Sequence, residues 1–455
     1  MNIVDLIRSE TAELPKGKIA VCCDRGDLSY TELFEKVDAV VSRLKEQGFL
    51  PLERVGLAFP DGADYVVMSL AILSIGGVLI PVSAGAADEV VEDILEKTAA
   101  TGLIVPAEDG FRLERRVPNI LLPDEFAEMQ PAFIRFSSGT TSASKGVLLT
   151  HPEIAERTRV ADQALKITSE DTVYWLLSMS FHFVVTILLF LRRGATISLC
   201  SEQFPYSFLS AVERGGGTFI YGTPVHYRTL TENQSIGADA LSGVRMAVST
   251  AMKLTDETAD AFNRKFGLTL QEAYGLIEAG LPFVNTSGEG DSVGRPLHGF
   301  EIEIRDVDER GVGEVWLRGP GMYSAYLHPW RRRLPDEWFA TGDVGKCDAE
   351  GALHLLGRTK NLVNFAGMKV FPYEVEAVLE RCEGVEAALV YAEPHPRYGQ
   401  LPCAKVVAPG LTEEKVQRFC YEHLESYKVP KKIEIVGCLE RTGSGKIKRE
   451  NPSCF

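Results

Sequence analysis

The sequence lacks a Cys-x-x-Cys pair and an excess of basic residues, and these two absences exclude several classes of protein. Its nine cysteines are an odd number among 455 residues and include no Cys-x-x-Cys pair, so neither a disulfide framework nor a zinc site is expected. Lys and Arg number 48 against 63 Asp and Glu, which gives a formal charge of −15. Nucleic-acid binders usually carry a basic excess, so no nucleic-acid partner is predicted. The cysteine pattern indicates a reducing, cytoplasmic compartment.

Long uncharged apolar runs are also scarce. The first ten residues have no apolar core after a basic patch, so no signal peptide is predicted. One run, residues 173–191, has no formal charge and precedes two arginines, and a spanning helix needs about 20 mostly apolar residues. This run contains two serines, a threonine and a central His182. We therefore predict a buried strand followed by a buried helix, and no membrane span.

The remaining composition is that of an ordinary globular protein, with 45% apolar and 24% charged residues. Strand-like and helical patterns alternate in the first part of the chain: residues 55–59 resemble a strand, 63–75 a helix and 78–82 a strand. This alternation predicts parallel sheets with crossover helices. The chain shows no internal repeat and no low-complexity segment.

The pattern changes after about residue 293. Residues 300–305 and 313–318 alternate with a period of two between Gly, Pro and Asp turns, which predicts a more antiparallel, barrel-like part. Beyond residue 357 the order is strand, helix, strand, helix, which predicts a small α/β domain. Its expected elements are a helix that starts over 370–379 with Val370 as its first residue, strands at 387–391 and 404–408, and a helix at 411–424.

A loop rich in Gly, Ser and Thr follows the apolar strand that ends near residue 137. Residues 137–146 read Ser-Ser-Gly-Thr-Thr-Ser-Ala-Ser-Lys-Gly. Glycine lets backbone amides face an anion, hydroxyls add donors and Lys145 adds a charge, so the loop suits a triphosphate better than a plain surface turn. It is not a Walker A loop, because Ser144 precedes the lysine and Gly146 follows it.

This loop resembles the signature of the adenylate-forming superfamily of AMP-dependent synthetases and ligases, which includes acyl-CoA and aryl-CoA synthetases, peptide-synthetase adenylation domains and luciferases. The usual form is close to Ser-Ser-Gly-Thr-Thr-Gly-x-Pro-Lys-Gly, from which Ser142 and Ser144 depart. Eight further segments carry the resemblance in the family's order: 28–33 (LSYTEL), 181–183 (FHF), 274–278 (YGLIE), 293–296 (VGRP), 313–320 (GEVWLRGP), 338–343 (WFATGD), 357–360 (GRTK) and 441–449 (RTGSGKIKR).

The resemblance implies an α/β fold with two domains. Residues 1–356 are expected to form a large N-terminal adenylation domain of two α/β subdomains plus a distorted β-barrel. Residues 357–360 would be a hinge, and residues 361–455 a small, mobile C-terminal α+β domain. The implied enzyme uses ATP and Mg²⁺ to convert a small carboxylic acid to acyl-AMP, releasing pyrophosphate. It then passes the acyl group to a thiol, either CoA or the phosphopantetheine of an acyl or peptidyl carrier protein.

The same resemblance assigns roles to individual residues. Glu278 and Thr140 would hold Mg²⁺, a cation that prefers oxygen ligands. Lys446 would stabilise negative charge at the α-phosphate, and Asp343 would accept hydrogen bonds from the ribose hydroxyls. The residues expected to contact ATP are Ser137, Ser138, Gly139, Thr141, Lys145, Tyr274, Gly275, Asp343, Arg358 and Lys360, of which Lys360 also takes the hinge position.

The acid and thiol sites are expected around His182, Tyr221 and Gly367. His182 would act catalytically as a lid on the carboxylate pocket, and Tyr221 would line that pocket. An apolar, partly aromatic pocket favours an aromatic or medium-sized apolar acid over an acetate-sized one. Gly367 would line the path of the incoming thiol.

Some positions depart from the family pattern and leave two alternatives open. Ile277 replaces a threonine that would donate to the α-phosphate, and Asn364 stands where many relatives have a lysine. Thr250 and Lys253 lie in a segment where the family prefers small residues. The first alternative is an adenylation-only enzyme that serves an amide-forming partner, and the second is a non-catalytic relative that binds acyl groups or nucleotides.

Overall fold

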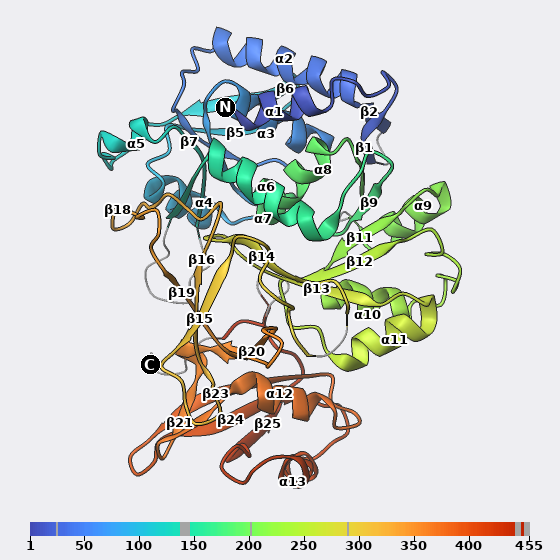
Figure 1. The fold of residues 1–455 in the computed structure, drawn as a ribbon, viewed down its shortest axis with the longest axis vertical. Helices are drawn as coiled ribbons and strands as arrows, with labels where there is room; N and C mark the ends of the chain where they lie inside the picture. Colours follow the sequence, from blue (N-terminus) through green and yellow to red (C-terminus); the bar gives the residue numbers. More distant parts are fainter. Residues whose placement is uncertain (24–25, 137–145, 201–202, 289–290, 442–446, 450–455) are drawn as a thin grey trace. The chain divides into compact units, whose positions relative to one another are not determined.

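The computed structural model describes residues 1–23, 26–136, 146–200, 203–288, 291–441 and 447–449 (Figure 1). Contacts within the chain divide it into two compact units. The first unit comprises Met1–Glu289, Pro296–Glu301 and Arg318–Glu337. The second comprises Gly290–Arg295, Ile302–Leu317 and Trp338–Phe455.

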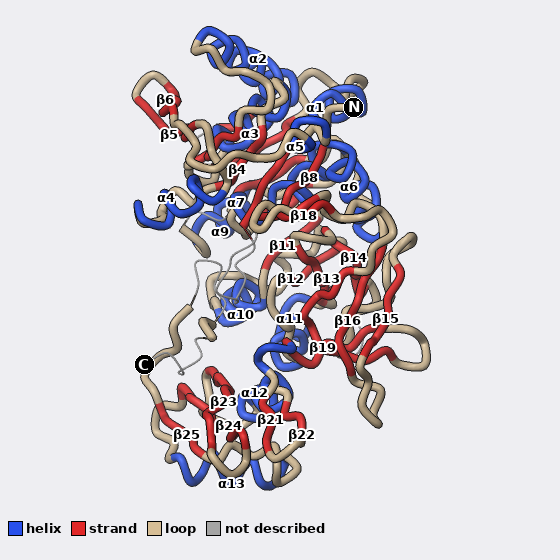
Figure 2. Tube along the Cα trace, turned by 90° about the vertical axis from the view of Figure 1, so that its left-hand side faces the viewer, coloured by secondary structure: helices blue, strands red, loops and turns tan. Residues whose placement is uncertain are grey.

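Within the described residues, the first unit holds two eight-stranded sheets, and Figure 2 shows β11 to β14 of one of them side by side. In spatial order, the first sheet consists of β14 (Gly280–Asn285), β13 (Leu270–Leu276), β12 (Met246–Thr250), β11 (Phe219–Gly222), β9 (Thr172–Trp175), β10 (Thr196–Leu199), β1 (Ile19–Cys23) and β2 (Gly26–Ser29). The second consists of β18 (Arg331–Arg332), β17 (Ala325–Tyr326), β8 (Gly146–Thr150), β7 (Pro131–Phe136), β4 (Val78–Pro81), β3 (Arg54–Leu57), β5 (Gly102–Ala107) and β6 (Gly110–Arg115).

The helices of the first unit connect these strands. They are α1 (Ile3–Glu10), α2 (Tyr30–Glu46), α3 (Ala63–Ser74), α4 (Asp88–Lys97), α5 (Glu125–Glu128), α6 (His151–Leu165), α7 (Met179–His182), the π-helix η1 (Phe183–Ile187), α8 (Leu188–Arg192), α9 (Tyr206–Arg214), α10 (Pro224–Glu232) and α11 (Asp256–Phe266). As predicted, α3 connects two parallel strands. These strands, β3 and β4, are neighbours in the second sheet, where Val55 lies opposite Leu79.

The apolar run at 173–191 forms the predicted strand followed by helical segments. Strand β9 leads into α7, the π-helix and α8, and every residue of α8 is buried. In the part of the chain that the structure describes, we find no helix with the length and apolar character needed to cross a bilayer.

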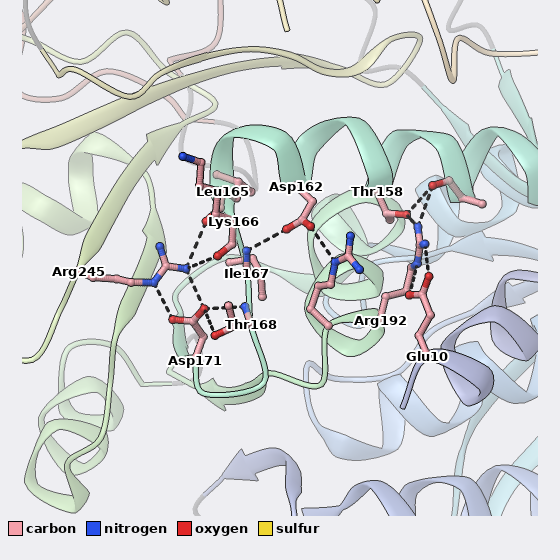
Figure 3. A network of polar contacts seen from close by, with 12 residues as sticks. Glu10, Thr158, Asp162, Leu165, Lys166, Ile167, Thr168, Asp171, Arg192 and Arg245 are labelled. Atoms are coloured by element: carbon pink, nitrogen blue, oxygen red, sulfur yellow. Dashed lines mark hydrogen bonds and ion pairs between the residues drawn. The ribbon is translucent and has the colours of Figure 1, made fainter. Parts of the chain in front are cut away.

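Helix α6 accepts hydrogen bonds from two arginines that are themselves paired with acidic residues (Figure 3). Arg192 pairs with Glu10 at 2.6 Å and donates to the carbonyl of Ala155 at 2.9 Å. Beyond the C-terminal end of the helix, Arg245 pairs with Asp171 at 2.8 Å and also donates to the carbonyl of Leu165. These contacts attach α6 to neighbouring segments of the first unit near its middle and at its C-terminal end.

The second unit contains a four-stranded sheet and a five-stranded sheet. The four-stranded sheet consists of β15 (Glu301–Arg305), β16 (Gly313–Arg318), β19 (Phe339–Cys347) and β20 (Leu353–Arg358), where β16–β19 and β19–β20 pair antiparallel. The five-stranded sheet consists of β22 (Met368–Val370), β21 (Val363–Phe365), β24 (Gly399–Val407), β23 (Ala387–His395) and β25 (Lys432–Ile435). The helices are η2 (Thr359–Asn361, 3-10), α12 (Pro372–Glu380) and α13 (Glu413–His423).

The C-terminal part of this unit has its own apolar core. Val375 and Leu379 of α12 and Val416 of α13 share that core with Ala404 and Val406 of β24. This confirms a small C-terminal α/β domain, but the predicted element order was incomplete. Helix α12 begins at Pro372 because proline suits the first turn of a helix, whereas Val370 ends β22. The short hairpin β21–β22 and the strand β25 were not predicted.

Candidate active site

The predicted phosphate loop lies outside the described residues, and so does the predicted catalytic lysine. The residues concerned are Ser137, Ser138, Gly139, Thr140, Thr141, Lys145 and Lys446. The described strands on either side of the loop, β7 and β8, pair antiparallel with Phe136 opposite Gly146.

Glu278 lies in the turn of the β13–β14 hairpin. Leu276 pairs with Gly280 across the turn, and Gly280 has a φ of +80°, a conformation that favours glycine. The Tyr326 hydroxyl donates to Oε1 of Glu278 at 3.3 Å. Burial, with Glu278 nearby, raises the pKa of Tyr326, so this phenol stays protonated as a donor. The turn therefore presents a carboxylate of the kind that Mg²⁺ binds.

The other two predicted residues of this hairpin lie on β13. The rings of Tyr274 and Phe283 are 5.8 Å apart and sit opposite each other across the β13–β14 ladder. Gly275 approaches the neighbouring strand closely, because an added Cβ would lie 2.8 Å from the carbonyl oxygen of Gly280. The structure therefore brings Tyr274, Gly275 and Glu278 together on one hairpin.

His182 and Tyr221 belong to one aromatic cluster, and Trp175 connects them. The Trp175 ring meets His182 edge-on at 6.2 Å and stacks on Tyr221 at 5.4 Å with 11° between the planes. Trp175 and Tyr221 are buried, whereas His182 is half-buried. His182 is the last residue of α7 and directly precedes the π-helix. Short π-helical segments are frequent at functional sites. Sequence reasoning missed Trp175, which lay unmarked within the apolar run.

In the second unit, Asp343 and Arg358 form an ion pair. They sit opposite each other on β19 and β20, with the Arg358 Nε 2.6 Å from the Asp343 Oδ1. Asp343 is buried, and its amide donates to the Thr341 hydroxyl, which donates in turn to the carbonyl of Val315. The predicted ribose acceptor is thus held at both its backbone and its carboxylate, and ionised carboxylates have further lone pairs to offer.

Lys360 lies near two arginines in the same unit. Burial of its amine, together with repulsion from Arg358 and Arg449, lowers the pKa of Lys360 to about 8, although the residue as a whole is exposed. Arg449 itself is anchored by Glu376, with Nη2 2.5 Å from Oε2, and its guanidinium lies 4.6 Å from the centre of the Tyr373 ring.

The Arg449–Glu376 pair fixes the described chain just after Lys446. Glu376 also accepts from the amide of Val390 at 2.7 Å, and burial raises the pKa of this carboxyl. Arg449 stood within a predicted motif but had no assigned role. Its partner lies 73 residues away, so no local pattern could have revealed the pair.

Gly367 lies at the tip of the β21–β22 hairpin with a φ of +86° and open space around its Cα. Its amide donates to Oδ1 of Asn364 at 3.0 Å, and the amide of Asn364 donates to Gln400. Asn364 therefore stabilises the turn through its own side-chain acceptor. A lysine, which has no acceptor, would lack that contact.

Comparison with known proteins identifies the family. The chain matches the family described as AMP-binding enzyme over residues 8–327 and its C-terminal domain over residues 374–446. A ligase of Mycobacterium tuberculosis named for joining a methyl-dioxo-octahydroindenyl-propanoyl group to CoA is 30% identical, and the match covers 96% of this chain and 95% of that protein. An oxalate–CoA ligase of Arabidopsis thaliana is 27% identical, with 98% and 96% covered.

A solved structure confirms the fold. The crystal structure of ATP-bound MatB from Rhodopseudomonas palustris superimposes with a TM-score of 0.85 at 24% identity, covering 98% of this chain and 97% of that one. The predicted superfamily, the α/β fold class and the predicted reaction, acyl-AMP formation followed by transfer to a thiol, are confirmed. The chain belongs to the AMP-binding enzyme family.

Proposed function

We propose that this ligase uses CoA as its thiol and binds ATP as a Mg²⁺ complex. The observation that carries the choice of CoA is that relatives matched along nearly their whole length are named as CoA ligases. CoA is therefore favoured over a carrier-protein phosphopantetheine. We further propose a cytoplasmic enzyme, because reducing conditions would keep its free cysteines as thiols.

In the proposed adenylation step, an oxygen of the acid attacks the α-phosphorus and pyrophosphate leaves. Mg²⁺ held at Glu278 and Thr140 would neutralise charge on the pyrophosphate. Asp343 accepts hydrogen bonds from the ribose hydroxyls while Arg358 balances its charge. Lys446 stabilises the α-phosphate, and the other nucleotide contacts are those assigned by the family resemblance.

The proposed acid is aromatic or of medium size and apolar. His182 closes the carboxylate end of the pocket, and Tyr221 with Trp175 forms its aromatic wall. The support is the stacked Trp175–Tyr221 pair and the edge contact between Trp175 and His182. Rings bury large apolar areas and favour offset or edge contacts with other rings.

We propose that residues 361–455 turn about a hinge at 357–360 between the two half-reactions. Phe371 shares a small apolar cluster with Val344 of β19 and with Val312, which directly precedes β16. This cluster would separate during the turn. Its small size is compatible with a reversible movement, since each buried side chain contributes only about 1.5–3 kcal/mol.

A panel of acids, assayed for AMP and pyrophosphate release with and without CoA, tests this function. The proposal expects acid-dependent pyrophosphate release, and thioester formation with CoA. Pyrophosphate release without a thioester would identify an adenylation-only enzyme instead. ATP binding without acid-dependent release would identify a non-catalytic relative.

The two half-reactions can be separated with Lys446→Ala. This variant should nearly abolish acyl-AMP formation, because loss of one such donor costs about 10²–10³-fold in rate, yet leave thioester formation from supplied acyl-AMP intact. Lys448→Ala is the matched control, since Lys448 is exposed and pairs with Glu440 at 3.3 Å. Equal loss in both half-reactions would contradict the two-step assignment of Lys446.

Gly367→Leu tests the second half-reaction, in which the thiol approaches the acyl-AMP. It should spare adenylation and block thioester formation, because Gly367 lies at the tip of a hairpin with open space around it. Gly351→Leu is the control for backbone strain, since Gly351 has a similar φ of +82° and no neighbour within 4 Å. A similar loss of thioester formation in both variants would indicate strain and would remove Gly367 from the thiol path.

A further inference from the structure

Arg157 is a buried cation to which the family resemblance assigns no role. It lies on the inner side of α6 and is 2% exposed. Burial lowers the pKa of its guanidinium to about 10, while Glu153 and Glu278 oppose that shift. The side chain is therefore charged at neutral pH. A buried charge is costly unless it is bonded, so its hydrogen bonds indicate its purpose.

Both described hydrogen bonds of Arg157 go to the segments that carry Glu278 and Tyr326. Its Nη2 donates to the backbone carbonyl of Glu278 at 2.8 Å, and its Nε donates to the carbonyl of Gly321 at 2.5 Å. The Glu278 carbonyl also accepts from the amide of Tyr323 at 2.8 Å. Two donors from distant parts of the chain thus fix the backbone of Glu278.

Arg157 is connected to Glu278 by two routes, one to its backbone and one to its carboxylate. Arg157 holds Gly321, and five residues further on, the Tyr326 hydroxyl reaches Oε1 of Glu278. The Glu278 backbone and the donor to its carboxylate are therefore tied to the same guanidinium. Ser324, between Gly321 and Tyr326, donates to Glu153 on the same helix.

Two glycines make room for the Arg157 side chain. A Cβ at Gly280 would lie 3.0 Å from Cγ of Arg157, and one at Gly321 would lie 2.8 Å from the same atom. Both glycines have positive φ values, +80° and +67°. Their backbones close around the arginine stem. The helix that carries it accepts a hydrogen bond at the Ala155 carbonyl from Arg192, which also pairs with Glu10 (Figure 3).

We propose that Arg157 is a positioning residue for adenylation: it fixes the turn at Glu278 so that the carboxylate meets Mg²⁺ on the nucleotide. Arg157 touches neither the acid nor the nucleotide in this scheme. It acts through the Glu278 carbonyl and through the segment that presents Tyr326. The inference rests on the proposed role of Glu278 and adds the residue that holds it in place.

The test compares Arg157→Met, Arg157→Lys and the control Arg159→Met. Methionine keeps the apolar stem, and lysine keeps the charge but not the pair of bonds. Arg159 is on the same helix, exposed, and paired with Glu156. Each variant is first checked for folding by circular dichroism. ATP affinity is then titrated against Mg²⁺ in the absence of acid, and both half-reactions are timed.

Arg157→Met should raise the Mg²⁺ concentration for half-maximal ATP binding by about tenfold, the effect of losing one hydrogen bond to a charged group. Its adenylation rate should fall with it, while thioester formation from supplied acyl-AMP stays within about twofold. Arg157→Lys should lie between Arg157→Met and the wild type, and Arg159→Met should match the wild type. If Arg157→Met does not fold, the comparison of Arg157→Lys with Arg159→Met decides.

An unchanged Mg²⁺ midpoint in a folded Arg157 variant would overturn the inference. Equal losses in both half-reactions would also overturn it, because they would indicate a general structural role. Failure of the proposed function gives a different result. The wild type would then release no pyrophosphate with any acid, yet the Mg²⁺ midpoint for ATP would still report on Arg157.

Discussion

Glu278 in the first compact unit and Asp343 in the second are both predicted to serve ATP, but the protein holds them in different ways. Glu278 is fixed through its backbone carbonyl, which accepts from Arg157 and from the Tyr323 amide. At Asp343 the arginine binds the carboxylate instead, because Arg358 forms a 2.6 Å ion pair with it. An arginine is involved in each case, but its bond goes to a different part of the acidic residue.

The difference matches the different ligands proposed for the two residues. A carboxylate paired with arginine has its charge largely balanced, and it keeps lone pairs that suit neutral ribose hydroxyls. A residue held by its backbone can direct its carboxylate oxygens toward a cation. We infer that charge balance matters most at Asp343 and that backbone geometry matters most at Glu278.

The largest expected effect comes from the Arg449–Glu376 pair of the second unit. Glu376→Ala should lower the free energy of unfolding by about 3 kcal/mol, because it leaves the half-buried Arg449 without its carboxylate. Hydrogen exchange at the Val390 amide, which donates to Glu376, gives a local readout. Glu383→Ala, which removes an exposed carboxylate of the same unit, is the control. Equal exchange rates in the two variants would contradict a stabilising role for the pair.

Asp343→Ala should give the next largest effect, on ATP. Each hydrogen bond to a charged group contributes about 1.5–3 kcal/mol, so the KM for ATP should rise by about 10–100-fold. Asp343→Asn, which keeps one oxygen acceptor, should lose less. Steady-state kinetics with varied ATP measures both variants. An unchanged KM in Asp343→Ala would remove this residue from the nucleotide site.

Local patterns in the sequence predicted much of this architecture. Ser29 and Glu32 form the capping box that begins α2 inside the segment recognised at 28–33. Gly267, with φ at +69°, ends α11 in the left-handed conformation that favours glycine at a helix end. Strand β16 has the predicted limits, 313–318. These features depend on residues within a few positions of each other, so sequence alone can reveal them.

Contacts between distant segments could not be predicted in the same way. Arg157 lies 121 residues from Glu278 and 164 from Gly321, and its bonds go to carbonyls, which every residue carries. The hairpin β21–β22 was missed because strands of three residues are too short to show a period of two. Sequence reasoning located Glu278 but not the residue that holds it.

Glu278→Gln tests whether the carboxylate of Glu278, in the first unit, binds Mg²⁺. The amide has the same shape as the carboxylate but no charge, so it should bind Mg²⁺ weakly while the Arg157 contact to the backbone remains. The adenylation rate should fall by about tenfold at low Mg²⁺ and recover in part at high Mg²⁺. Rates measured across a Mg²⁺ series decide, and an equal loss at every concentration would place Glu278 away from the metal.

Ile277→Thr concerns the residue next to Glu278 in the same turn. Threonine restores a hydroxyl at the position where the family uses one, so the adenylation rate should stay the same or rise by a few-fold, roughly the effect of one neutral hydrogen bond. Ile277 is half-buried, so melting temperature is measured alongside the rate. A slower reaction at unchanged melting temperature would show that this phosphate contact does not transfer to this chain.

The smallest expected effect is a pH dependence at Lys360 in the second unit. The folded protein holds the pKa of Lys360 near 8, against 10.5 for an ordinary lysine, through burial and repulsion from Arg358 and Arg449. The unfolded chain therefore binds more protons between about pH 8 and 10.5, and the folded state gains stability as pH rises through that window. Below pH 8 the amine of Lys360 is charged in the folded protein, and the full cost in stability remains.

Lys360→Met removes this cost, so the variant should melt at a higher temperature than the wild type at neutral pH, and the difference should vanish by about pH 10.5. The effect should be small and should shrink in salt, because Lys360 is exposed and its charge is screened. Lys369→Met, another exposed lysine of the same unit, is the control and should show no such convergence. A difference between Lys360→Met and wild type that is constant with pH would show that the lowered pKa of Lys360 is not its source.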